Sequence, residues 1–357
     1  MKVVEIIQGY SHGDGINKAA VSIADALSRI KGVEVTLVHE RGSPPTRTAK
    51  RESFLGSIRE AARGADIVHS HIGTGVFKAN AAKLANPRLR HVTTYSVIAP
   101  REIYAKYHFT LLFHKLIYSR GIDAVVGISK YACDDFRKRF GRHAQLIYDG
   151  VDLQEFRPAT AAGAAFRRKH GIGADKIVIG FVSRFDGHKN HAAIVRAMPK
   201  LPKDAVAVLG GVGGGKYDTM EECRKLAASL KVADRIVFAG FIAEKDMNAF
   251  YNSIDIHAFP SLWEGFGLGV LEASAVGKPT VGFPVYSIKE LVGGAAGNGI
   301  LAKDQSAFTA ALNRLCSDGK LRRKLGDGGR EFAKDFAWEK VAMRYKHLFD
   351  GLLEERK

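Results

Sequence analysis

The sequence predicts an α/β protein with two doubly wound, Rossmann-like domains, and three observations support this prediction. Short apolar runs alternate with amphipathic helical segments from the first residue, which is typical of parallel sheets with crossover helices. A second series of the same kind follows an Ala- and Gly-rich interruption near the middle of the chain. At 357 residues, the chain is long enough for two hydrophobic cores. Because such domains bind ligands at the carboxyl ends of their strands, we expect the two sheets to face each other across a cleft.

The first domain is expected to cover residues 1–165. Apolar residues recur at helical spacing between Asn17 and Lys31, and the apolar runs on either side are short enough for strands. The expected strands are Val3–Gln8, Val33–Val38, Asp66–His69, His91–Thr94, Ala124–Ile128 and Gln145–Tyr148. A turn at Asp149–Asp152 and the Ala- and Gly-rich run Ala159–Ala165 then predict a linker to the second domain.

The second domain is expected to cover residues 166–337, and it repeats the alternation of strand and helix. Its expected strands are Ile177–Ser183, Ala205–Leu209, Arg235–Ala239, Asp255–Phe259 and Thr280–Phe283. From Gln305 onward the pattern is mostly helical. The amphipathic segment Trp338–Leu353 predicts a last helix, so we expect residues 338–357 to return to the first domain.

The charge and composition restrict the class of protein. The chain carries a formal charge of +17, and residues 1–170 alone hold 27 basic and 15 acidic side chains. Such a field favours anionic partners such as nucleotides, acidic lipid surfaces or nucleic acid. No apolar stretch is long enough to cross a membrane, and the first residues are expected to form a strand and not a signal peptide. The three cysteines, Cys133, Cys223 and Cys316, lie far apart in sequence, which fits a reducing, cytoplasmic compartment.

The most informative stretch runs from Ser261 to Ala275, where a strand is followed by a glycine-rich turn and a helix. Glu264 stands just before the turn, and Glu272 lies about two helical turns into the helix. Free backbone N–H groups at a helix N-terminus bind anions such as phosphate, and carboxylates accept hydrogen bonds from hydroxyl groups. This combination fits a ligand with phosphate in its middle and hydroxyls at both ends, which is the layout of a nucleotide-sugar.

Two cations follow the first strand of the second domain. Arg184 and Lys189 place positive charge at the carboxyl end of that strand, where a diphosphate can sit. The segment Gly210–Lys216 is followed by Tyr217, where a nucleotide phosphate loop has Ser or Thr, so we reject an ATPase. No Asp-x-Asp sequence and no His/Cys cluster with ligand spacing is present. We therefore expect neither a metal nor another cofactor, with the cations and the helix N-terminus neutralising a diphosphate instead.

Several segments occur in the same order as in one known family. They are Asp66-Ile-Val-His-Ser-His71, Gly127-Ile-Ser129, Leu146–Asp152 with Phe156, Gly180–Arg184 with Lys189, and Glu264 and Glu272 followed by Ala-x-Ala and Gly-x-Pro. This ordered series resembles the retaining GT-B glycosyltransferases of the "glycosyl transferases group 1" family (family 4). The resemblance extends over nearly the whole chain, although Asp149 stands where the family usually has Asn.

The resemblance implies roles for residues of both domains. Glu272 would hydrogen-bond the ribose hydroxyls, Glu264 would hold the sugar, and Arg184 with Lys189 would stabilise the charge on the leaving nucleoside diphosphate. The other implied donor-binding residues are Phe266, Gly267 and Leu268 at the sugar and phosphate, Phe241 and Ile242 at the base edge, and Gly13, Asp14 and Gly15 from the first domain. Since the Gly13–Gly15 loop would reach the donor from the other domain, domain closure over the donor is expected.

The residues expected near the reacting sugar depart from the family pattern. Many members place a histidine at the end of the fourth strand, where this chain has Tyr95. Tyr95 can donate a hydrogen bond to the sugar, and His71 or His12 can approach the same point. The candidate catalytic residues are therefore Glu264, Arg184, Lys189, His71 and Tyr95.

The predicted function is transfer of a hexose from a UDP- or GDP-linked sugar to a lipid-linked, glycan or polysaccharide acceptor, with retention of anomeric configuration. The donor phosphate would accept the acceptor proton, so no dedicated carboxylate base is needed. Two alternatives remain open. One is a nucleotide-sugar epimerase or phosphorylase-like enzyme with the same fold, and the other is a non-catalytic basic protein that binds membrane or nucleic acid.

The segment Arg101–Arg120 mixes aromatic and basic side chains over the length of one helix. It fits either a crossover helix packed on the first domain or a helix on an anionic membrane. We expect a cytoplasmic enzyme of cell-envelope polysaccharide synthesis, peripheral on the inner face of the plasma membrane. No nucleic-acid partner is expected, because no nucleic-acid-binding module is recognised in the sequence.

Overall fold

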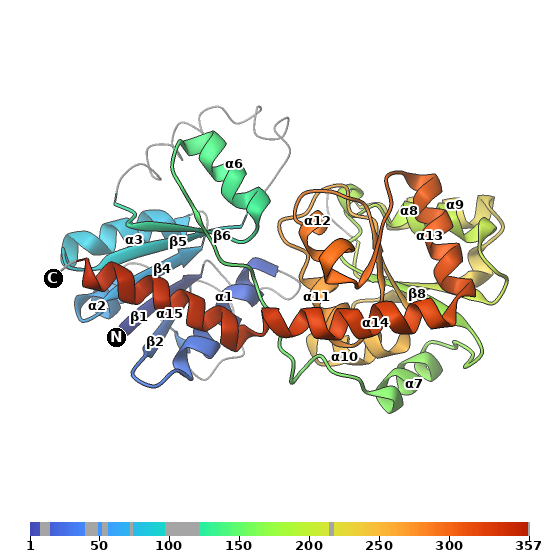
Figure 1. The fold of residues 1–357 in the computed structure, drawn as a ribbon, viewed down its shortest axis with the longest axis horizontal. Coiled ribbons are helices and arrows are strands. Elements are labelled where there is room, and N and C mark those ends of the chain that lie inside the picture. The colour runs from blue at the N-terminus through green and yellow to red at the C-terminus, as the bar shows by residue number, and fades with distance from the viewer. Residues whose placement is uncertain are drawn as a thin grey trace. The chain divides into compact units, whose positions relative to one another are not determined.

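The computed structural model describes residues 1–7, 15–39, 49–51, 56–71, 74–96, 121–213 and 218–355. The chain forms two compact units (Figure 1). The first contains Met1–Gly150 and Trp338–Lys357, and the second contains Val151–Ala337. Each unit has its own parallel sheet with helices, as predicted for doubly wound domains. Among the residues described, no helix is long and apolar enough to span a membrane.

The first unit is built on a seven-stranded sheet with the order β3-β2-β1-β4-β5-β6-β7, and its strand pairs are parallel. The strands are β1 (Lys2–Ile7), β2 (Glu34–His39), β3 (Ala49–Arg51), β4 (Ile67–His71), β5 (Arg90–Tyr95), β6 (Ala124–Gly127) and β7 (Gln145–Leu146). The order reverses between β1 and β4, which is therefore the topological switch point of this unit. The sequence analysis missed β3, because three residues with two cations show no apolar alternation.

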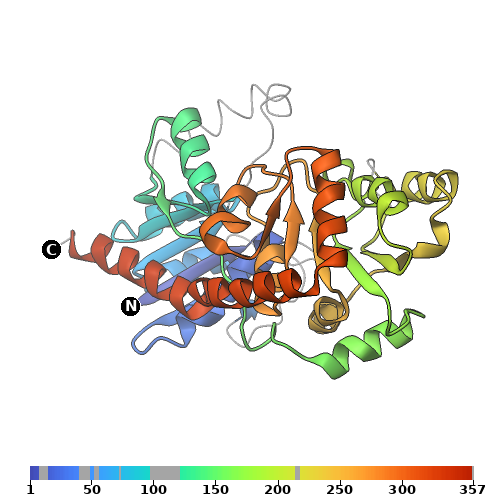
Figure 2. The ribbon, with the colours of Figure 1, turned by 45° about the vertical axis from the view of Figure 1, so that its right-hand side comes forward.

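The described helices of the first unit are α1 (Gly15–Ser28), α2 (Gly56–Arg63), α3 (Thr74–Ala85), α6 (Lys130–Phe140) and α15 (Trp338–Glu354). From Val3 to Ile7 every residue of β1 is buried, as expected for a parallel strand covered on both faces. Helix α15, drawn in red, packs against α1, and its Tyr345 and Phe349 are fully buried (Figure 2). The C-terminal helix is therefore part of the first unit's core.

The second unit has a six-stranded parallel sheet with the order β10-β9-β8-β11-β12-β13. Its strands are β8 (Ile177–Val182), β9 (Ala205–Gly210), β10 (Ile236–Gly240), β11 (Ile256–Phe259), β12 (Thr280–Gly282) and β13 (Gly299–Leu301). In order of appearance within the unit this is the 3-2-1-4-5-6 arrangement of dinucleotide-binding folds. Its switch point lies between β8 and β11.

The helices of the second unit cover both faces of its sheet, as a doubly wound topology requires (Figure 1). They are α7 (Thr160–Lys169), α8 (His191–Ala197), α9 (Met220–Ser229), α10 (Glu244–Ser253), α11 (Leu268–Ala275), α12 (Ile288–Leu291), α13 (Gln305–Ser317) and α14 (Gly319–Ala333). Short 3-10 turns occur at η1 (Gly187–Lys189), η2 (Met198–Lys200), η3 (Ala233–Arg235), η4 (Gly294–Ala296) and η5 (Lys334–Phe336). Asp304 and Asp318 cap α13 and α14 by accepting backbone N–H bonds of 2.8 Å each.

The boundary between the units lies after Gly150, earlier than the predicted boundary after residue 165. Helix α7 packs against α10, and a Cβ added at Gly163 would lie 2.5 Å from the carbonyl oxygen of Asn252. The backbone N–H of Ala159 also donates to the Asn252 side chain at 2.6 Å. The predicted linker is therefore wrong: its small residues allow two helices to approach closely within the second unit.

Two buried histidines predict how the stability of the second unit depends on pH. His191 and His257 are 0% and 1% exposed, and burial lowers the pKa of each to about 3. Below the usual histidine pKa of about 6.5, the unfolded chain binds protons that the folded unit does not bind. The free energy of unfolding therefore falls as the pH falls from 6.5 toward 3, by about 2 kcal/mol per histidine between pH 7 and pH 5.

The two tryptophans allow this to be measured for the second unit, because Trp263 belongs to it and Trp338 does not. In a Trp338→Phe background, urea unfolding followed by fluorescence should show a clearly lower midpoint at pH 5 than at pH 7. Adding His257→Gln should reduce that difference, since one of the histidines that titrates differently in the folded and unfolded states is removed. Equal midpoints at both pH values would contradict the prediction.

Candidate functional site

The switch point of the second sheet brings together two segments that lie far apart in sequence. β8 pairs in parallel with β11, so the loops that follow Val182 and Phe259 leave the same edge of the sheet. The loop after β8 carries Arg184 and Lys189, and the loop after β11 carries Glu264. Ligands of doubly wound proteins bind at this edge, where the two loops diverge.

An ion pair joins the two loops. Nζ of Lys189 lies 2.6 Å from Oε2 of Glu264, and each side chain is 17% exposed. The backbone N–H of Leu262 donates to the carbonyl of His188 at 2.7 Å, which holds the loops beside each other. The Asn190 side chain, from a left-handed backbone position, donates to the carbonyl of Pro260 at 3.3 Å. A cation and a carboxylate are thus fixed side by side at the switch point.

The structure adds an aromatic pair that the sequence analysis did not name. The rings of His188 and Trp263 are stacked, with centroids 4.0 Å apart and planes 15° apart. Burial, with a further contribution from Lys189, lowers the pKa of His188 to about 4, so this ring is neutral at pH 7. The charged side chains close enough to affect it are Lys189, Glu264, Asp186 and Arg184. The sequence indicates this aromatic pair only through chain neighbours: His188 directly precedes Lys189, and Trp263 directly precedes Glu264.

Arg184 lies in the same group but is more exposed. Its guanidinium is 3.0 Å from the Asp186 carboxylate, and its side chain is 66% exposed. An ion pair this exposed contributes little to stability, so the guanidinium can turn toward an anionic ligand at small cost. Together with Lys189 it gives the edge two positive charges.

The N-terminus of α11 faces the same turn. Gly267 is the N-cap residue with φ 105°, and it has no side chain that could accept from the first-turn N–H groups of the helix. The carbonyl of Phe266 accepts a hydrogen bond from the Ser287 hydroxyl at 2.7 Å, which fixes the turn. The structure thus places Phe266, Gly267 and Leu268 at a helix N-terminus, where anions are stabilised.

Glu272 lies inside α11 and is held by a residue that the sequence analysis missed. The Tyr251 hydroxyl, from α10, donates to Oε2 of Glu272 at 2.9 Å, and Glu272 is 7% exposed. Burial and the adjacent carboxylate raise the pKa of Tyr251 well above its usual value, so the phenol stays a donor. Tyr251 therefore orients the Glu272 carboxylate. No local pattern around Tyr251 indicates this contact.

Exposed apolar side chains follow the ends of three strands of the sheet, β9 and its neighbour β10 on one side of β8 and β11 on the other. Val212, Phe241 and Leu262 are 46%, 55% and 52% exposed and follow β9, β10 and β11. A backbone hydrogen bond of 2.7 Å from Gly211 to Gly240 joins the first two strand ends. Ile242, the other predicted base-edge residue, is buried at 9% exposure. The edge therefore offers apolar surface beside the charged group, which suits a ligand with flat apolar and ionic parts.

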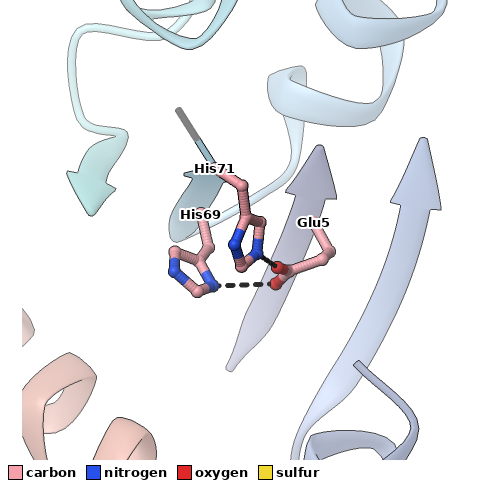
Figure 3. Close-up of side chains that lie close together, drawn as sticks. All are labelled: Glu5, His69 and His71. Atoms are coloured by element: carbon pink, nitrogen blue, oxygen red, sulfur yellow. Dashed lines mark hydrogen bonds and ion pairs between the residues drawn. The ribbon is translucent and has the colours of Figure 1, made fainter. Parts of the chain in front are cut away.

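The first unit contains a buried side-chain cluster at its own switch point, and we name Glu5, His69 and His71 the Glu5 cluster (Figure 3). Nδ1 of His69 lies 3.0 Å from one carboxylate oxygen of Glu5, and Nε2 of His71 lies 2.5 Å from the other. The sequence analysis expected no His/Cys cluster with ligand spacing. That expectation is wrong, because these three side chains are close enough together to hold a metal ion. Glu5 is remote in sequence, and only the pairing of β1 with β4 brings it to the histidines.

Hydrogen bonds and charges within the Glu5 cluster outweigh the effect of burial on the carboxyl group. Burial alone would raise the pKa of Glu5, but His69 and His71 bring it down to about 2. Burial also lowers the pKa of His71, while Glu5 opposes that change. The pKa of Asp149, which acts on His71 electrostatically, is raised to about 7 by burial. His71 is thus surrounded by buried ionisable groups of the first unit.

Tyr95 lies at the end of β5 and contacts helix α6. It is 3% exposed, and its hydroxyl donates to the Asp135 carboxylate of α6 at 2.6 Å. Its ring packs against Phe136 and Phe140 of the same helix. The hydroxyl of Tyr95 is thus bonded to α6, whereas His71 is bonded to Glu5 of β1. A role of Tyr95 at the sugar stays a prediction.

Part of the predicted site falls outside the described residues. Gly15 is the first residue of α1, whereas Gly13, Asp14 and His12 lie in a segment that the structure does not describe. The same holds for Arg101–Arg120.

Comparison with solved structures identifies the class of fold. HepE (Alr3699) of Anabaena, in a structure with UDP and glucose, superimposes with a TM-score of 0.86 at 19% identity, covering 98% of this chain and 100% of that chain. The sucrose-phosphate synthase of Thermosynechococcus elongatus gives 0.81 at 22% identity, covering 99% of each chain. Two doubly wound units with this similarity define the GT-B fold.

Curated relatives are similar over about two thirds of this chain. A GDP-mannose-dependent alpha-(1-6)-phosphatidylinositol monomannoside mannosyltransferase of Mycolicibacterium smegmatis is 32% identical over 249 residues, 66% of this chain and 64% of that protein. A D-inositol 3-phosphate glycosyltransferase of Salinispora arenicola is 32% identical over 251 residues, 65% of this chain and 54% of that protein. The chain thus covers less than two thirds of the length of these relatives.

Two family models match the chain in sequence. Residues 164–332 match "Glycosyl transferases group 1", and residues 13–155 match "Glycosyltransferase Family 4". The chain therefore belongs to the GT-B glycosyltransferases of the glycosyl transferases group 1 family (family 4), as the order of its motifs predicted.

The close approach of β8 and β9 at the candidate site gives a stability prediction. Gly211 has φ 129°, and a Cβ at this position would lie 1.8 Å from the carbonyl oxygen of Ser183. Gly211→Ala should therefore destabilise the second unit by about 2–5 kcal/mol. Gly187→Ala is the matched control, because its nearest neighbour would lie 4.0 Å away, and it should change stability by less than about 0.5 kcal/mol. In the Trp338→Phe background, urea unfolding followed by Trp263 fluorescence measures both, and equal midpoints would disprove the assigned close contact.

Proposed function

We propose that the chain is a retaining hexosyltransferase that moves a hexose from a UDP- or GDP-linked sugar to a lipid-linked, glycan or polysaccharide acceptor. One observation carries this proposal: the β8–β11 pairing gathers Arg184, the Lys189–Glu264 ion pair, the N-terminus of α11 and Glu272 in one region. A nucleotide-sugar has an anionic diphosphate between two hydroxyl-bearing rings. The cations and the helix N-terminus suit the diphosphate, and the two carboxylates suit the hydroxyl groups of the two rings.

The diphosphate is proposed to lie against Arg184, Lys189 and the first turn of α11. The Lys189 ammonium has three N–H donors, so it can keep its bond to Glu264 and still donate to a phosphate oxygen. Negative charge grows on the diphosphate as the glycosidic bond breaks, and these groups stabilise it. In this proposal no metal bridges the diphosphate.

The nucleoside is proposed to bind between Glu272 and the apolar strand ends. Glu272, oriented by Tyr251, would accept hydrogen bonds from the ribose hydroxyls. The exposed ring of Phe241 provides a face on which a base can stack, next to the backbone of Gly240 and Ile242. The sugar would then lie toward Glu264.

The relatives supply the first donors and acceptors to test. One is described as GDP-mannose-dependent, while the fold relative HepE is described in complex with UDP and glucose, which supports testing both bases. The acceptors named for the two curated relatives, a phosphatidylinositol mannoside and an inositol phosphate, both carry phosphate on an inositol ring. An anionic acceptor of that kind fits the positive charge of the first half of the chain.

The first unit is proposed to bind the acceptor, with the Gly13–Gly15 loop and domain closure completing the site. The acceptor hydroxyl would attack on the face of the leaving group and pass its proton to the donor phosphate, which retains the anomeric configuration. His71 remains the candidate from the first unit for a contact to the reacting sugar. The enzyme would work at the cytoplasmic face of an anionic membrane, and flotation with acidic lipid vesicles tests that partner.

A screen of nucleotide-sugars by thermal stabilisation tests the donor class first. We expect UDP or GDP sugars of one kind to raise the melting temperature and to support transfer to an inositol-containing or lipid-linked acceptor. Proton NMR of the product should show the anomeric configuration of the donor. An epimer formed from donor alone, or cleavage that requires inorganic phosphate, would replace the proposal with the epimerase or phosphorylase alternative. Stabilisation by no nucleotide or nucleotide-sugar would reject it.

Glu272→Gln tests the ribose contact. The change removes the charge but keeps the side-chain volume, so donor affinity should fall about 10- to 100-fold, as expected for loss of hydrogen bonds to a charged group. Glu221→Gln, on the exposed face of α9, is the matched control and should leave donor affinity unchanged. Calorimetric titration with UDP or GDP measures both variants. Wild-type affinity in Glu272→Gln would contradict the assignment.

A further inference from the structure

The Glu5 cluster is built by the register of two adjacent strands. Glu5 of β1 stands directly beside His69 of β4 in the parallel register, and His71 follows two residues later. Because side chains alternate between the two faces of a strand, these three point to the same face of the sheet (Figure 3). The His-x-His spacing on one strand therefore presents two imidazoles to a single point, with a carboxylate from the neighbouring strand.

The ring nitrogens and the carboxylate converge in a region closed to solvent. One ligand atom from each of the three residues lies within 4.8 Å of the others. The side chains of Glu5 and His69 are 0% exposed, and that of His71 is 5% exposed. This set of two imidazoles and one carboxylate is a ligand set that zinc prefers among biological cations.

The buried carboxylate of the cluster needs partners that stabilise its charge. A buried carboxylate is stable in its ionised form only beside positive charge or several hydrogen-bond donors. Within the described part of the chain, both ion-pair partners of Glu5 are histidines, which carry charge only when protonated. The carboxylate is therefore balanced either by N–H groups that the two rings donate or by a metal ion that the rings and the carboxylate bind together.

Residues around the cluster hold one ligand in the orientation that a metal requires. Nε2 of His69, the nitrogen turned away from Glu5, lies 2.7 Å from the Thr94 hydroxyl. Thr94 in turn is 2.9 Å from the Tyr345 hydroxyl of α15. Metal-bound histidines usually donate their second N–H to such a partner, which fixes the ring and its tautomer. The His69 ring is further packed against the rings of Tyr345 and Phe349.

We propose that Glu5, His69 and His71 supply three ligands of a binding site for a divalent transition-metal ion, with Zn²⁺ as the best match. The ligand atoms of a tetrahedral zinc site lie about 3.3 Å apart, so the present separations of 3.0 Å and 2.5 Å must open by less than about 1 Å. The ion replaces the protons shared between the rings and the carboxylate, and these move to the second ring nitrogens or to water. The site joins β1, β4 and, through Thr94 and Tyr345, helix α15. It lies in the first unit, and a metal ion held by His71 would replace the sugar contact proposed for that residue, while donor binding in the second unit would not depend on it.

Metal analysis of the tag-free whole chain tests the proposal. After incubation with Zn²⁺ and gel filtration, the wild type should retain one zinc per chain and melt at a higher temperature than protein treated with a chelator. Glu5→Gln and His71→Ala should lose the zinc. His347→Ala, an exposed histidine on α15, is the matched control and should keep it. Substoichiometric zinc in the wild type, or equal zinc in Glu5→Gln, overturns the proposal.

A second measurement needs no variant and so does not depend on the folding of the substituted chains. Titration of the wild type with Co²⁺ should produce visible absorption bands that saturate at one equivalent and vanish when Zn²⁺ is added. Absence of these bands in folded protein overturns the proposal and leaves the Glu5 cluster as a hydrogen-bonded network.

Discussion

The parallel pairing of β8 with β11 is the constraint on which the candidate donor site depends. β8 is the first strand of the second unit and β11 is its fourth, so the loops that follow them turn to opposite faces of the sheet and leave an opening at its edge. That single pairing lets Lys189 and Glu264, 75 residues apart, meet at 2.6 Å. The His188–Trp263 stack is a direct consequence, because each ring is the chain neighbour of one member of the ion pair. A different position of β11 in the sheet would separate all of these groups.

The first unit uses the same topology for different chemistry. Its switch point, between β1 and β4, holds the Glu5 cluster, whose side chains are nearly inaccessible to solvent. At the second unit's switch point the ion pair is partly exposed, so a ligand can compete for its members at moderate cost. In the closed Glu5 cluster, substitution of any one member is costly in stability, because it leaves the other side chains buried without a partner. Its connection through Thr94 to Tyr345 makes the C-terminal helix part of the same network.

Much of the fold could be predicted from the sequence, because the features that define it are local. Apolar runs and helical periodicity located nearly all strands to within a few residues. The order of motifs placed Arg184, Lys189 and Glu264 after strand ends of one domain and Glu272 in the helix that follows. The errors have physical reasons. β3 is stabilised by its pairing with β2 and not by its own composition. The run Ala159–Ala165 resembles a linker, yet small residues also permit the close packing of α7 on α10.

What the sequence by itself determined is the alternation of elements, the two-domain organisation and the residue types available for phosphate and hydroxyl groups. These follow from periodicity and turn residues, which act over a few positions. Only the tertiary structure decided which side chains became partners: Tyr251 with Glu272, Glu5 with the two histidines, and Thr94 with Tyr345, 251 residues away. Such contacts depend on strand register and on the packing of helices over the sheet. A hydrogen bond forms only when both groups reach about 3 Å with correct geometry, and no local sequence pattern contains that information.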